Sequence, residues 1–335
     1  MRLRTFLATA TAALTAAGCL TAAAPAGATP PRACSPSVSL DRFSDALDKT
    51  TYDGTYVGNL SALAVDLPRS RLRSSGGTST GSLVALSDRS ALFRLDARTL
   101  EPEGVVPLAD EEGNGLDSEG LVVDRDGTYL VSSETEPSVR RHSRDGKVLG
   151  RLPVPDALRT APEGPARANG TFEGLTLLPG GRTLLASMEY PLAGDPADLV
   201  RFQTWQRSAH GSFRLGAQYT YRVDRGLGVS EVTATPDGRL LVLERGFTSG
   251  VGNTVRLYLA DRHRAAFEKT LLADLVHCPS LGATAEQPQP NPLLDNIEGM
   301  VITGRGQGRL KVLLVSDDNQ NDVQTTRFYA LRVRV

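Results

Sequence analysis

Four short stretches of the chain repeat one pattern, in which an acid leads into a short apolar run. The acids are Glu119, Glu173, Glu231 and Glu298, and the first, second and fourth are each followed by Gly-Leu or Gly-Met. They lie 54, 58 and 67 residues apart. A repeat of this length predicts an array of similar structural units that pack side by side, because one such unit cannot bury its apolar face alone.

Each repeat continues as a hairpin. The first apolar run meets a turn containing Asp126-Gly127, Gly180-Gly181 or Asp237-Gly238, and a second apolar run follows. Such dipeptides favour hairpin turns because those turns need a positive φ. A degenerate first unit, Leu60 to Leu95, has Ser61 and Ala62 in place of the glutamate. The second runs end in further acids, namely Glu134, Glu189, Glu244, and Asp317 with Asp318.

Helical periodicity is almost absent, so these units predict an all-β protein. We expect a β-propeller of five to six blades built from four-stranded antiparallel sheets. Five inner hairpins are visible, and weakly patterned regions leave room for a sixth blade. Residues 60–335 are expected to form the propeller. Residues 29–59 are expected to help close the ring, with Leu40 to Val57 pairing with the last strand, Arg327 to Val335.

The amino terminus has the features of an export signal. Arg2 and Arg4 precede an Ala/Leu/Thr run that ends in Ala26-Gly27-Ala28, which predicts a signal peptide over residues 1–28 and a secreted protein. Gly18-Cys19 offers a lipoprotein site as the minority alternative, although the residues before it lack a large aliphatic side chain. No later segment is long and apolar enough to span a membrane.

Cys34 and Cys278 remain after the predicted cleavage, and export favours a disulfide between them. Two buried free thiols are the alternative. The formal charge of the whole chain is -1, and no basic, aromatic-rich stretch is present. These features exclude a nucleic-acid-binding surface. We expect a monomer whose partner is a small molecule.

The order of strands in a propeller brings the repeated acids together. The start of an inner strand and the end of the second strand lie at the same end of the channel, so we expect a girdle of about eight carboxylates at one mouth. Crowded carboxylates either take up protons or bind a cation. Their hard oxygen donors favour Ca²⁺ over zinc, copper or Mg²⁺. The predicted calcium ligands are Glu119, Glu134, Glu173, Glu189, Glu231, Glu244, Glu298, Asp317 and Asp318. In the alternative interpretation the acids accept hydrogen bonds from backbone amides and are purely structural.

Catalytic candidates come from the same positions. A guanidinium next to bound calcium would hold a phosphate group, which favours Arg245; an ion pair with neighbouring carboxylates is the alternative. The sequence has no His-Glu-x-x-His motif, and its four histidines lie in expected outer strands or loops, which argues against a serine triad. The predicted catalytic residues are Glu119, Glu173, Glu298 and Arg245.

These motifs resemble those of the bacterial phytase-like family, often labelled "esterase-like activity of phytase". The resemblance lies in Ser118-Glu119-Gly120-Leu121, Phe172-Glu173-Gly174-Leu175, Leu243-Glu244-Arg245 and Ile297-Glu298-Gly299-Met300, with the acids that follow. It implies a propeller and calcium-assisted hydrolysis of phosphoesters or related esters, with carboxylates as ligands and base. Only four lysines are present, and no basic cradle for a polyphosphorylated ring is evident. The alternative function is a non-catalytic secreted propeller that binds a ligand or partner through its loop face.

Overall fold

The computed structural model describes residues 32–66 and 82–335. The predicted signal peptide and Cys19 lie outside these residues. The described chain is built from strands, with short 3₁₀ turns at Asp156–Leu158 and Leu275–His277 and no α-helix in the described ranges. The prediction of an all-β protein is therefore confirmed.

Five four-stranded antiparallel sheets make up the fold. In four of them, consecutive strands follow one another from the innermost to the outermost position. The first sheet contains β4 (Leu60–Asp66), β5 (Ser82–Ser87), β6 (Ala91–Asp96) and β7 (Pro102–Pro107). The second contains β8 (Ser118–Val123), β9 (Tyr129–Ser133), β10 (Ser138–His142) and β11 (Val148–Arg151). The third contains β12 (Phe172–Leu177), β13 (Thr183–Met188), β14 (Leu199–Arg207) and β15 (Phe213–Arg222).

The fourth sheet contains β16 (Gly228–Ala234), β17 (Leu240–Thr248), β18 (Gly252–His263) and β19 (Ala266–Asp274). A short parallel contact between β15 and β19 joins its outer edge to the third sheet. The fifth sheet contains β20 (Ile297–Gly306), β21 (Arg309–Ser316), β22 (Phe328–Val333) and, at its outer edge, β1 (Val38–Ser44). A separate hairpin pairs β2 (Thr50–Tyr52) with β3 (Thr55–Val57).

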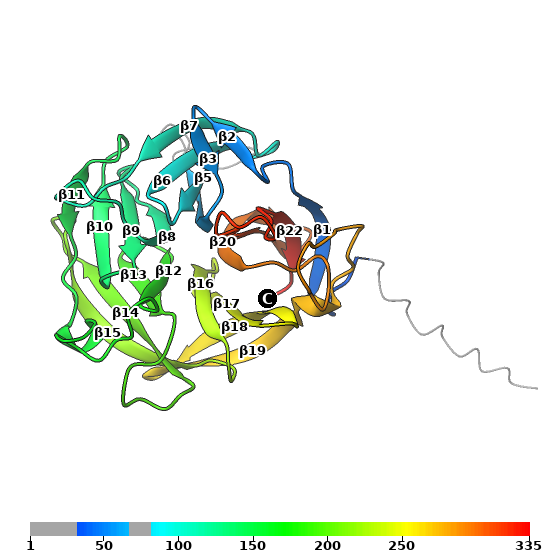
Figure 1. The fold of residues 1–335 in the computed structure, drawn as a ribbon. Helices are drawn as coiled ribbons and strands as arrows, with labels where there is room; N and C mark the ends of the chain where they lie inside the picture. The colour runs from blue at the N-terminus through cyan, green and yellow to red at the C-terminus, as the bar shows by residue number, and fades with distance from the viewer. Residues whose placement is uncertain (1–31, 67–81) are drawn as a thin grey trace, which may run out of the picture. The chain divides into compact units, whose positions relative to one another are not determined.

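The five sheets form a closed ring of blades (Figure 1). Each innermost strand contacts the innermost strand of the next sheet, in the order β4, β8, β12, β16 and β20, and β20 contacts β4 again. The fold is thus a five-bladed β-propeller, and the described residues contain no sixth blade. Apolar side chains fill the spaces between neighbouring blades and form the core.

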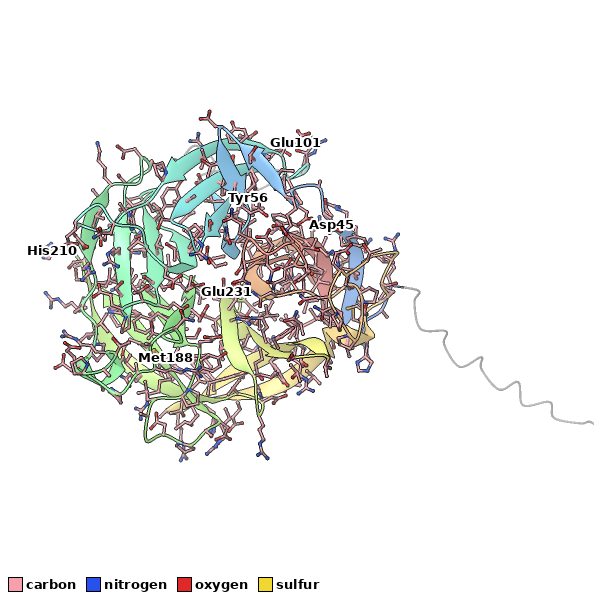
Figure 2. The ribbon with its side chains drawn as sticks, viewed as in Figure 1. Asp45, Tyr56, Glu101, Met188, His210 and Glu231 are labelled. Atoms are coloured by element: carbon pink, nitrogen blue, oxygen red, sulfur yellow. A yellow bond between two sulfur atoms is a disulfide. The ribbon has the colours of Figure 1, made fainter. Side chains whose placement is uncertain are left out.

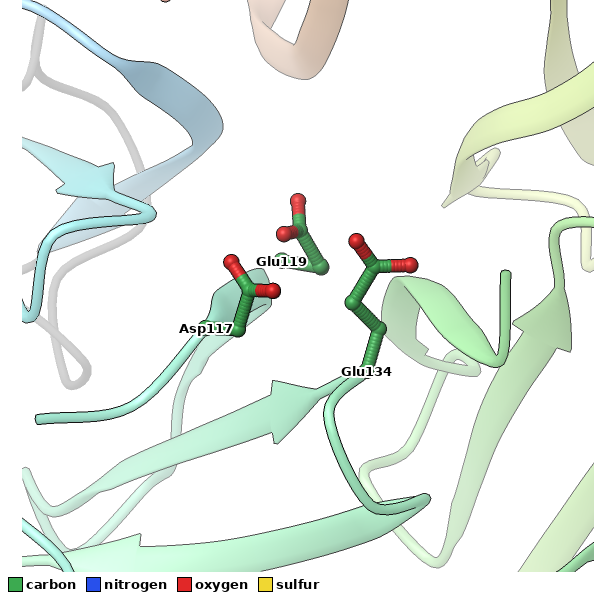
Figure 3. A group of neighbouring side chains, drawn as sticks. All are labelled: Asp117, Glu119 and Glu134. Atoms are coloured by element: carbon green, nitrogen blue, oxygen red, sulfur yellow. The ribbon is translucent and has the colours of Figure 1, made fainter. Parts of the chain in front are cut away.

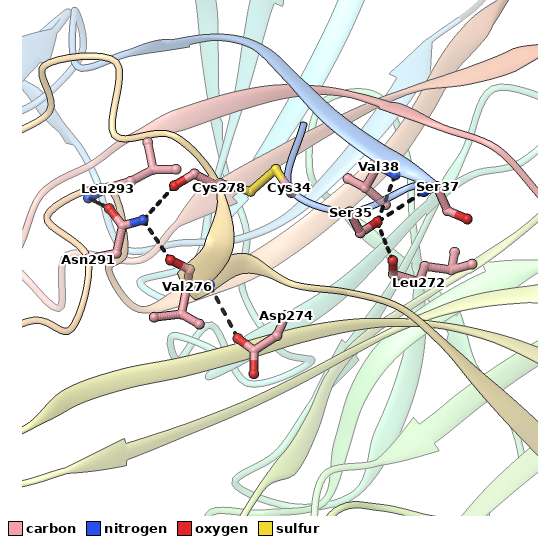
Figure 4. The surroundings of a disulfide bond; sticks show 10 residues. All are labelled: Cys34, Ser35, Ser37, Val38, Leu272, Asp274, Val276, Cys278, Asn291 and Leu293. Carbon is pink, nitrogen blue, oxygen red and sulfur yellow. Dashed lines mark hydrogen bonds between the residues drawn. A yellow bond between two sulfur atoms is a disulfide. The ribbon is translucent and has the colours of Figure 1, made fainter. Parts of the chain in front are cut away.

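The two ends of the described chain meet in the fifth blade. Strand β1 pairs antiparallel with β22, from Val38 opposite Val333 to Ser44 opposite Phe328. The rest of the segment Leu40 to Val57 forms the β2–β3 hairpin and does not pair with β22. The predicted disulfide between Cys34 and Cys278 is confirmed, and it ties the residues before β1 to the turn after β19 (Figure 4).

The glycine of the Glu-Gly repeat is required by the packing between blades. A Cβ atom on Gly120 would lie 2.4 Å from the carbonyl oxygen of Glu173, and one on Gly174 would lie 2.4 Å from the backbone nitrogen of Val232. Hydroxyl groups add hydrogen bonds between blades: Ser132 Oγ, for example, donates to the carbonyl of Glu173 at 2.9 Å. Inner strands therefore approach one another too closely for a side chain at this position.

Candidate functional site

The inner strand of every blade carries one extra residue at the same height, a β-bulge. In β20, Ile297 opposes Ser316 and Gly299 opposes Val315, which leaves Glu298 as the extra residue. The same shift in β8 and β12 falls at Glu119 and Glu173. A bulge changes the direction of the side chain that it carries. These three glutamates therefore project into the mouth of the channel.

In the other two blades a serine takes the bulge position. Leu60 opposes Ser87 and Ala62 opposes Leu86, so Ser61 is the extra residue of β4. In β16, Val229 opposes Glu244 and Glu231 opposes Leu243, so the extra residue is Ser230. The structural equivalent of Glu119 in the fourth blade is therefore Ser230, and the predicted equivalent, Glu231, lies one residue further on.

A second set of side chains comes from the residue that follows the paired end of each second strand. Glu134 follows β9, and its N–H donates to the carbonyl of Asp117; Glu189 follows β13 in the same way and donates to Thr171. Asp88 and Asp317 take this position after β5 and β21. In the fourth blade the position belongs to Arg245, one residue after Glu244. Four blades thus present an acid here and one presents a cation.

The charged members of these two sets line one pocket of about 590 Å³, which we call the acidic pocket. Six of the nine predicted calcium ligands line it, namely Glu119, Glu134, Glu173, Glu189, Glu298 and Asp317. The other lining residues are Asp88, Arg89, Asp117, Arg167, Asn169, Tyr190, Arg245, Phe247, Asn253, Gln287, Asn296, Asn319, Asn321 and Gln324.

Glu231 lies apart from the acidic pocket, among the inner strands near the central axis (Figure 2). Its Oε1 atom accepts hydrogen bonds from the backbone N–H groups of Leu175, at 3.2 Å, and Val232, at 2.8 Å. Burial raises the pKa of this carboxyl well above its ordinary value. Glu231 thus has the structural role that was the alternative interpretation of the repeat.

Glu244 also lies outside the pocket, because neighbouring residues of a strand face opposite sides and Arg245 takes the inward position. Its Oε1 atom accepts hydrogen bonds from the Tyr221 hydroxyl at 2.6 Å and from Lys269 Nζ at 2.5 Å. The expected meeting of Glu231 and Glu244 at the channel mouth therefore does not occur.

Asp318 differs from its neighbour Asp317 in that it does not line the acidic pocket. Its carboxylate accepts hydrogen bonds from the backbone N–H of Asn59 and from Lys49 Nζ, both at 2.9 Å, and from the Tyr56 hydroxyl. These contacts hold the residues after β1 and the β2–β3 hairpin against the fifth blade. All oxygen atoms of Asp318 that could bind a cation are thus already used in protein contacts.

Two groups of three carboxylates within the acidic pocket are close enough to share a cation. In the first group, one oxygen each of Asp117, Glu119 and Glu134 lie within 4.8 Å of one another (Figure 3). Glu134, Glu173 and Glu189 form the second group, so Glu134 belongs to both. Glu134 as a whole residue is 6% exposed, and its Oε2 atom has no hydrogen-bond partner within residues 32–66 and 82–335. The donor set and this unpartnered oxygen fit a hard divalent cation.

Burial and mutual repulsion disfavour the ionised form of these acids. Burial first, and then the neighbouring carboxylates, raise the pKa values of Glu119 and Glu173 well above the ordinary range. The same causes raise the pKa of Glu134 to about 8, and burial with the charge of Asp317 raises that of Asp88 to about 7. Without a cation, the pocket would therefore hold several protons at neutral pH.

Arg245 is a partly buried cation that lines this pocket. Its Nη2 atom lies 3.0 Å from Glu298 Oε1 and 3.5 Å from Glu189 Oε1. This arrangement matches the ion-pair alternative. Burial still raises the pKa values of both acids, and the charge of Arg245 opposes that rise. The Nε atom of Arg245 has no hydrogen-bond partner in the described part of the chain.

Sequence reasoning left several lining residues out of the site. Asp88 directly follows the second strand of the degenerate first unit, as Glu134 follows the second strand of the next unit. The repeat therefore contained the information needed to predict Asp88 as a pocket residue. Asn253 comes from the start of β18, and Gln287 comes from the connection between the 3₁₀ turn at Leu275–His277 and β20; neither is part of the repeated acid pattern. A repeat pattern could not have identified these two residues.

The fold and the site together define a five-bladed propeller with a pocket of buried carboxylates where its inner hairpins begin. The chain belongs to the phytase-like family described as "Esterase-like activity of phytase", whose model matches residues 55–320. The family expected from the sequence is thus confirmed.

Two individual proteins are similar to parts of the chain. An uncharacterized secreted protein of Arthroderma benhamiae is 32% identical over 117 residues, which cover 28% of this chain and 23% of that protein. The chain therefore matches about a quarter of that relative's length. The crystal structure of a protein of unknown function from Bacteroides caccae aligns with a TM-score of 0.35 and 12% identity, over 73% of this chain and 69% of that one. Among the described residues, no helix has the length and apolar character needed to cross a membrane.

Proposed function

We propose that this protein is a secreted, calcium-binding hydrolase that acts on phosphoesters or related esters of small molecules in the acidic pocket. The main support is the geometry of the two groups of three carboxylate residues. Both groups include Glu134, a buried residue with an unpartnered oxygen. Membership of a family described by esterase-like activity supports the choice of reaction.

The proposed ligands are Asp117, Glu119 and Glu134 for one cation position and Glu134, Glu173 and Glu189 for a neighbouring one. All of their donor atoms are carboxylate oxygens. Calcium accepts many oxygen ligands in a flexible arrangement, whereas Mg²⁺ keeps several of its own waters. When bound, calcium would polarise an oxygen of the ester and favour ionisation of a nearby water.

The remaining pocket residues supply the other functions of a hydrolase. Glu298, Asp88 and Asp317 line the pocket outside both groups of three carboxylates, so they are the acids left to accept a proton from water. Arg245 holds Glu298 in place through its 3.0 Å ion pair and adds positive charge where a negatively charged ester would bind. Glu119 and Glu173 contribute as proposed calcium ligands.

Turnover of p-nitrophenyl phosphate and p-nitrophenyl acetate by the purified protein tests this proposal. We expect activity with calcium, loss of activity with a chelator, and recovery when calcium is restored. Glu134→Gln should abolish the activity, and Glu231→Gln should retain it, because Glu231 lies outside the pocket. Absence of turnover with and without calcium would contradict the hydrolase proposal and favour the non-catalytic alternative. Activity that persists in chelator would remove the metal from the proposal.

A further inference from the structure

The fourth blade gives the acidic pocket a side of different chemistry. Phe247 on β17 and Asn253 on β18 stand directly opposite each other in the hairpin, and both line the pocket. Residues opposite each other in a sheet share a face, as do residues two apart on one strand. Arg245, Phe247 and Asn253 therefore present an arginine, an aromatic ring and a carboxamide to the same space.

The carboxamide of Asn253 is buried without using its hydrogen-bonding capacity. The residue is 1% exposed, and neither Nδ2 nor Oδ1 has a partner among the described residues. Its backbone N–H donates to Gln289 Oε1 at 2.8 Å, so the local chain conformation does not depend on the side chain. Buried polar groups in proteins almost always have partners, and an exception needs an explanation.

A neighbouring loop brings a second amide, with a nitrogen that is unpartnered among the described residues, to the pocket. Gln287 lies in the connection between the 3₁₀ turn at Leu275–His277 and β20, and its buried Nε2 atom has no partner in the described ranges. This loop is fixed at both ends. The disulfide of Cys278 holds its start, and Arg327 donates to the carbonyls of Thr284 and Pro292. The backbone of the loop is therefore held on both sides of Gln287.

The free atoms indicate the chemistry of the ligand. Asn253 offers a donor and an acceptor together, and a hydroxyl group both donates and accepts. Phosphate oxygens that carry no proton only accept, and hydrocarbon does neither. Phe247 is 56% exposed, which leaves a ring face free to pack against the C–H groups of a saturated ring.

We propose that Asn253, Gln287 and Phe247 form a subsite for a polyhydroxylated group, a sugar or similar polyol, that is the alcohol part of the ester substrate. Its identity as part of an ester rests on the proposed function, whereas the subsite binds hydroxyl groups whether or not turnover follows. A nucleobase would also pair with a carboxamide, but it stacks best between two free aromatic faces. The second aromatic ring of the pocket, that of Tyr190, already has Arg167 at 5.0 Å from its centroid.

Binding of compounds that cannot be hydrolysed tests the subsite separately from catalysis. Calorimetry with the calcium-loaded protein would compare the methyl glycosides of glucose, galactose and mannose with adenosine and phenylphosphonate. We expect at least one methyl glycoside to bind more tightly than adenosine. Asn253→Leu should weaken that binding at least tenfold and leave phenylphosphonate binding unchanged.

The thermal stability of Asn253→Leu distinguishes loss of a binding group from loss of a structural one. Since Asn253 makes no side-chain hydrogen bond to the described residues, the variant should melt at the wild-type temperature or above. Asn291→Leu is the contrasting variant, because the Asn291 amide donates to the carbonyls of Val276 and Cys278, and it should melt lower. Absence of glycoside binding, tighter binding of adenosine, or unchanged glycoside affinity in Asn253→Leu would each overturn the subsite.

Discussion

Glu134→Gln is the substitution that tests the acidic pocket most directly. Glu134 belongs to both groups of carboxylates, is almost fully buried, and has an oxygen without a partner among the described residues. Without calcium its charge is opposed by burial and by its neighbours, chiefly Glu189 and Asp117. Glutamine keeps the shape of the side chain and removes the charge. The metal-free protein should therefore become more stable while calcium binding is lost.

The size of the effect follows from the pKa of this carboxyl, which rises from 4.5 to about 8 on folding. At pH 7 the unfolded chain carries the ionised form, and the folded chain carries mainly the protonated one. Each pH unit between 4.5 and 7 adds about 1.4 kcal/mol to the free-energy cost of folding, because the carboxyl must take up a proton. At pH 7 this site therefore lowers the free energy of unfolding by roughly 3 kcal/mol. Glutamine removes this cost, but burial of its own amide without a hydrogen-bond partner is also unfavourable and cancels part of the gain. A net gain of about 1–3 kcal/mol in the free energy of unfolding is expected.

Urea unfolding at pH 7, in chelator and in calcium, measures both effects. Wild-type protein at a calcium concentration 100 times Kd should gain about 2.7 kcal/mol over the metal-free protein. Glu134→Gln should show little of this gain. Glu231→Gln is the matched control, since it also alters a buried glutamate but should keep the full response to calcium. If metal-free Glu134→Gln is less stable than wild type, or if its calcium response is intact, the electrostatic account of the pocket is wrong.

Three further predictions follow from the fold and the pocket. The raised pKa values of carboxyls such as Glu134 and Asp88 mean that the folded, metal-free protein binds more protons than the unfolded chain between about pH 4 and 8. Its stability should fall as pH rises through this range, and saturating calcium should remove the trend; unfolding curves in chelator at pH 5 and 8 would show this. Gly120→Ala should destabilise the fold by about 1–3 kcal/mol through its clash with the next inner strand, whereas Gly304→Ala, with open space around it, should melt near wild type. Cys278→Ser should lower the free energy of unfolding by up to about 5 kcal/mol, because the disulfide closes a loop of 244 residues; unchanged unfolding curves after reduction would contradict this.

The propeller could be predicted because its signals are local. A turn such as Asp126-Gly127 between two apolar runs defines a hairpin by itself, and the repeat of such hairpins defines the blades. Even the degenerate first unit, without its glutamate, retained the apolar runs of β4 and β5. Most of the acids stand at the start of an inner strand or the end of the second strand, and the order of strands in a propeller places these points at the same end of the channel.

The acids of the fourth blade were misplaced because their direction depends on the register of the strands. A shift of one residue turns a side chain to the other face. In a sequence alignment of the repeats, Glu231 and Glu244 match Glu119 and Glu134. In the structure, the bulge of the fourth blade is at Ser230, and Arg245 occupies the position that faces the pocket. The sequence carried one warning. Glu231 is followed by valine, whereas each glutamate at a bulge is followed by the glycine that close packing between blades requires.

This departure of the fourth blade from the repeat has a consequence for function. A ring with an acid from every blade would attract cations and repel the negatively charged part of a phosphoester. Arg245 replaces one of those acids with a positive charge, and Asn253 and Phe247 on the same hairpin add groups suited to a neutral ligand. The carboxylates that could share a cation come from the second and third blades. The pocket is therefore asymmetric. For the proposed hydrolase, we expect this asymmetry to orient an ester, with its charged group toward the proposed calcium ligands and Arg245 and its alcohol part toward Phe247 and Asn253.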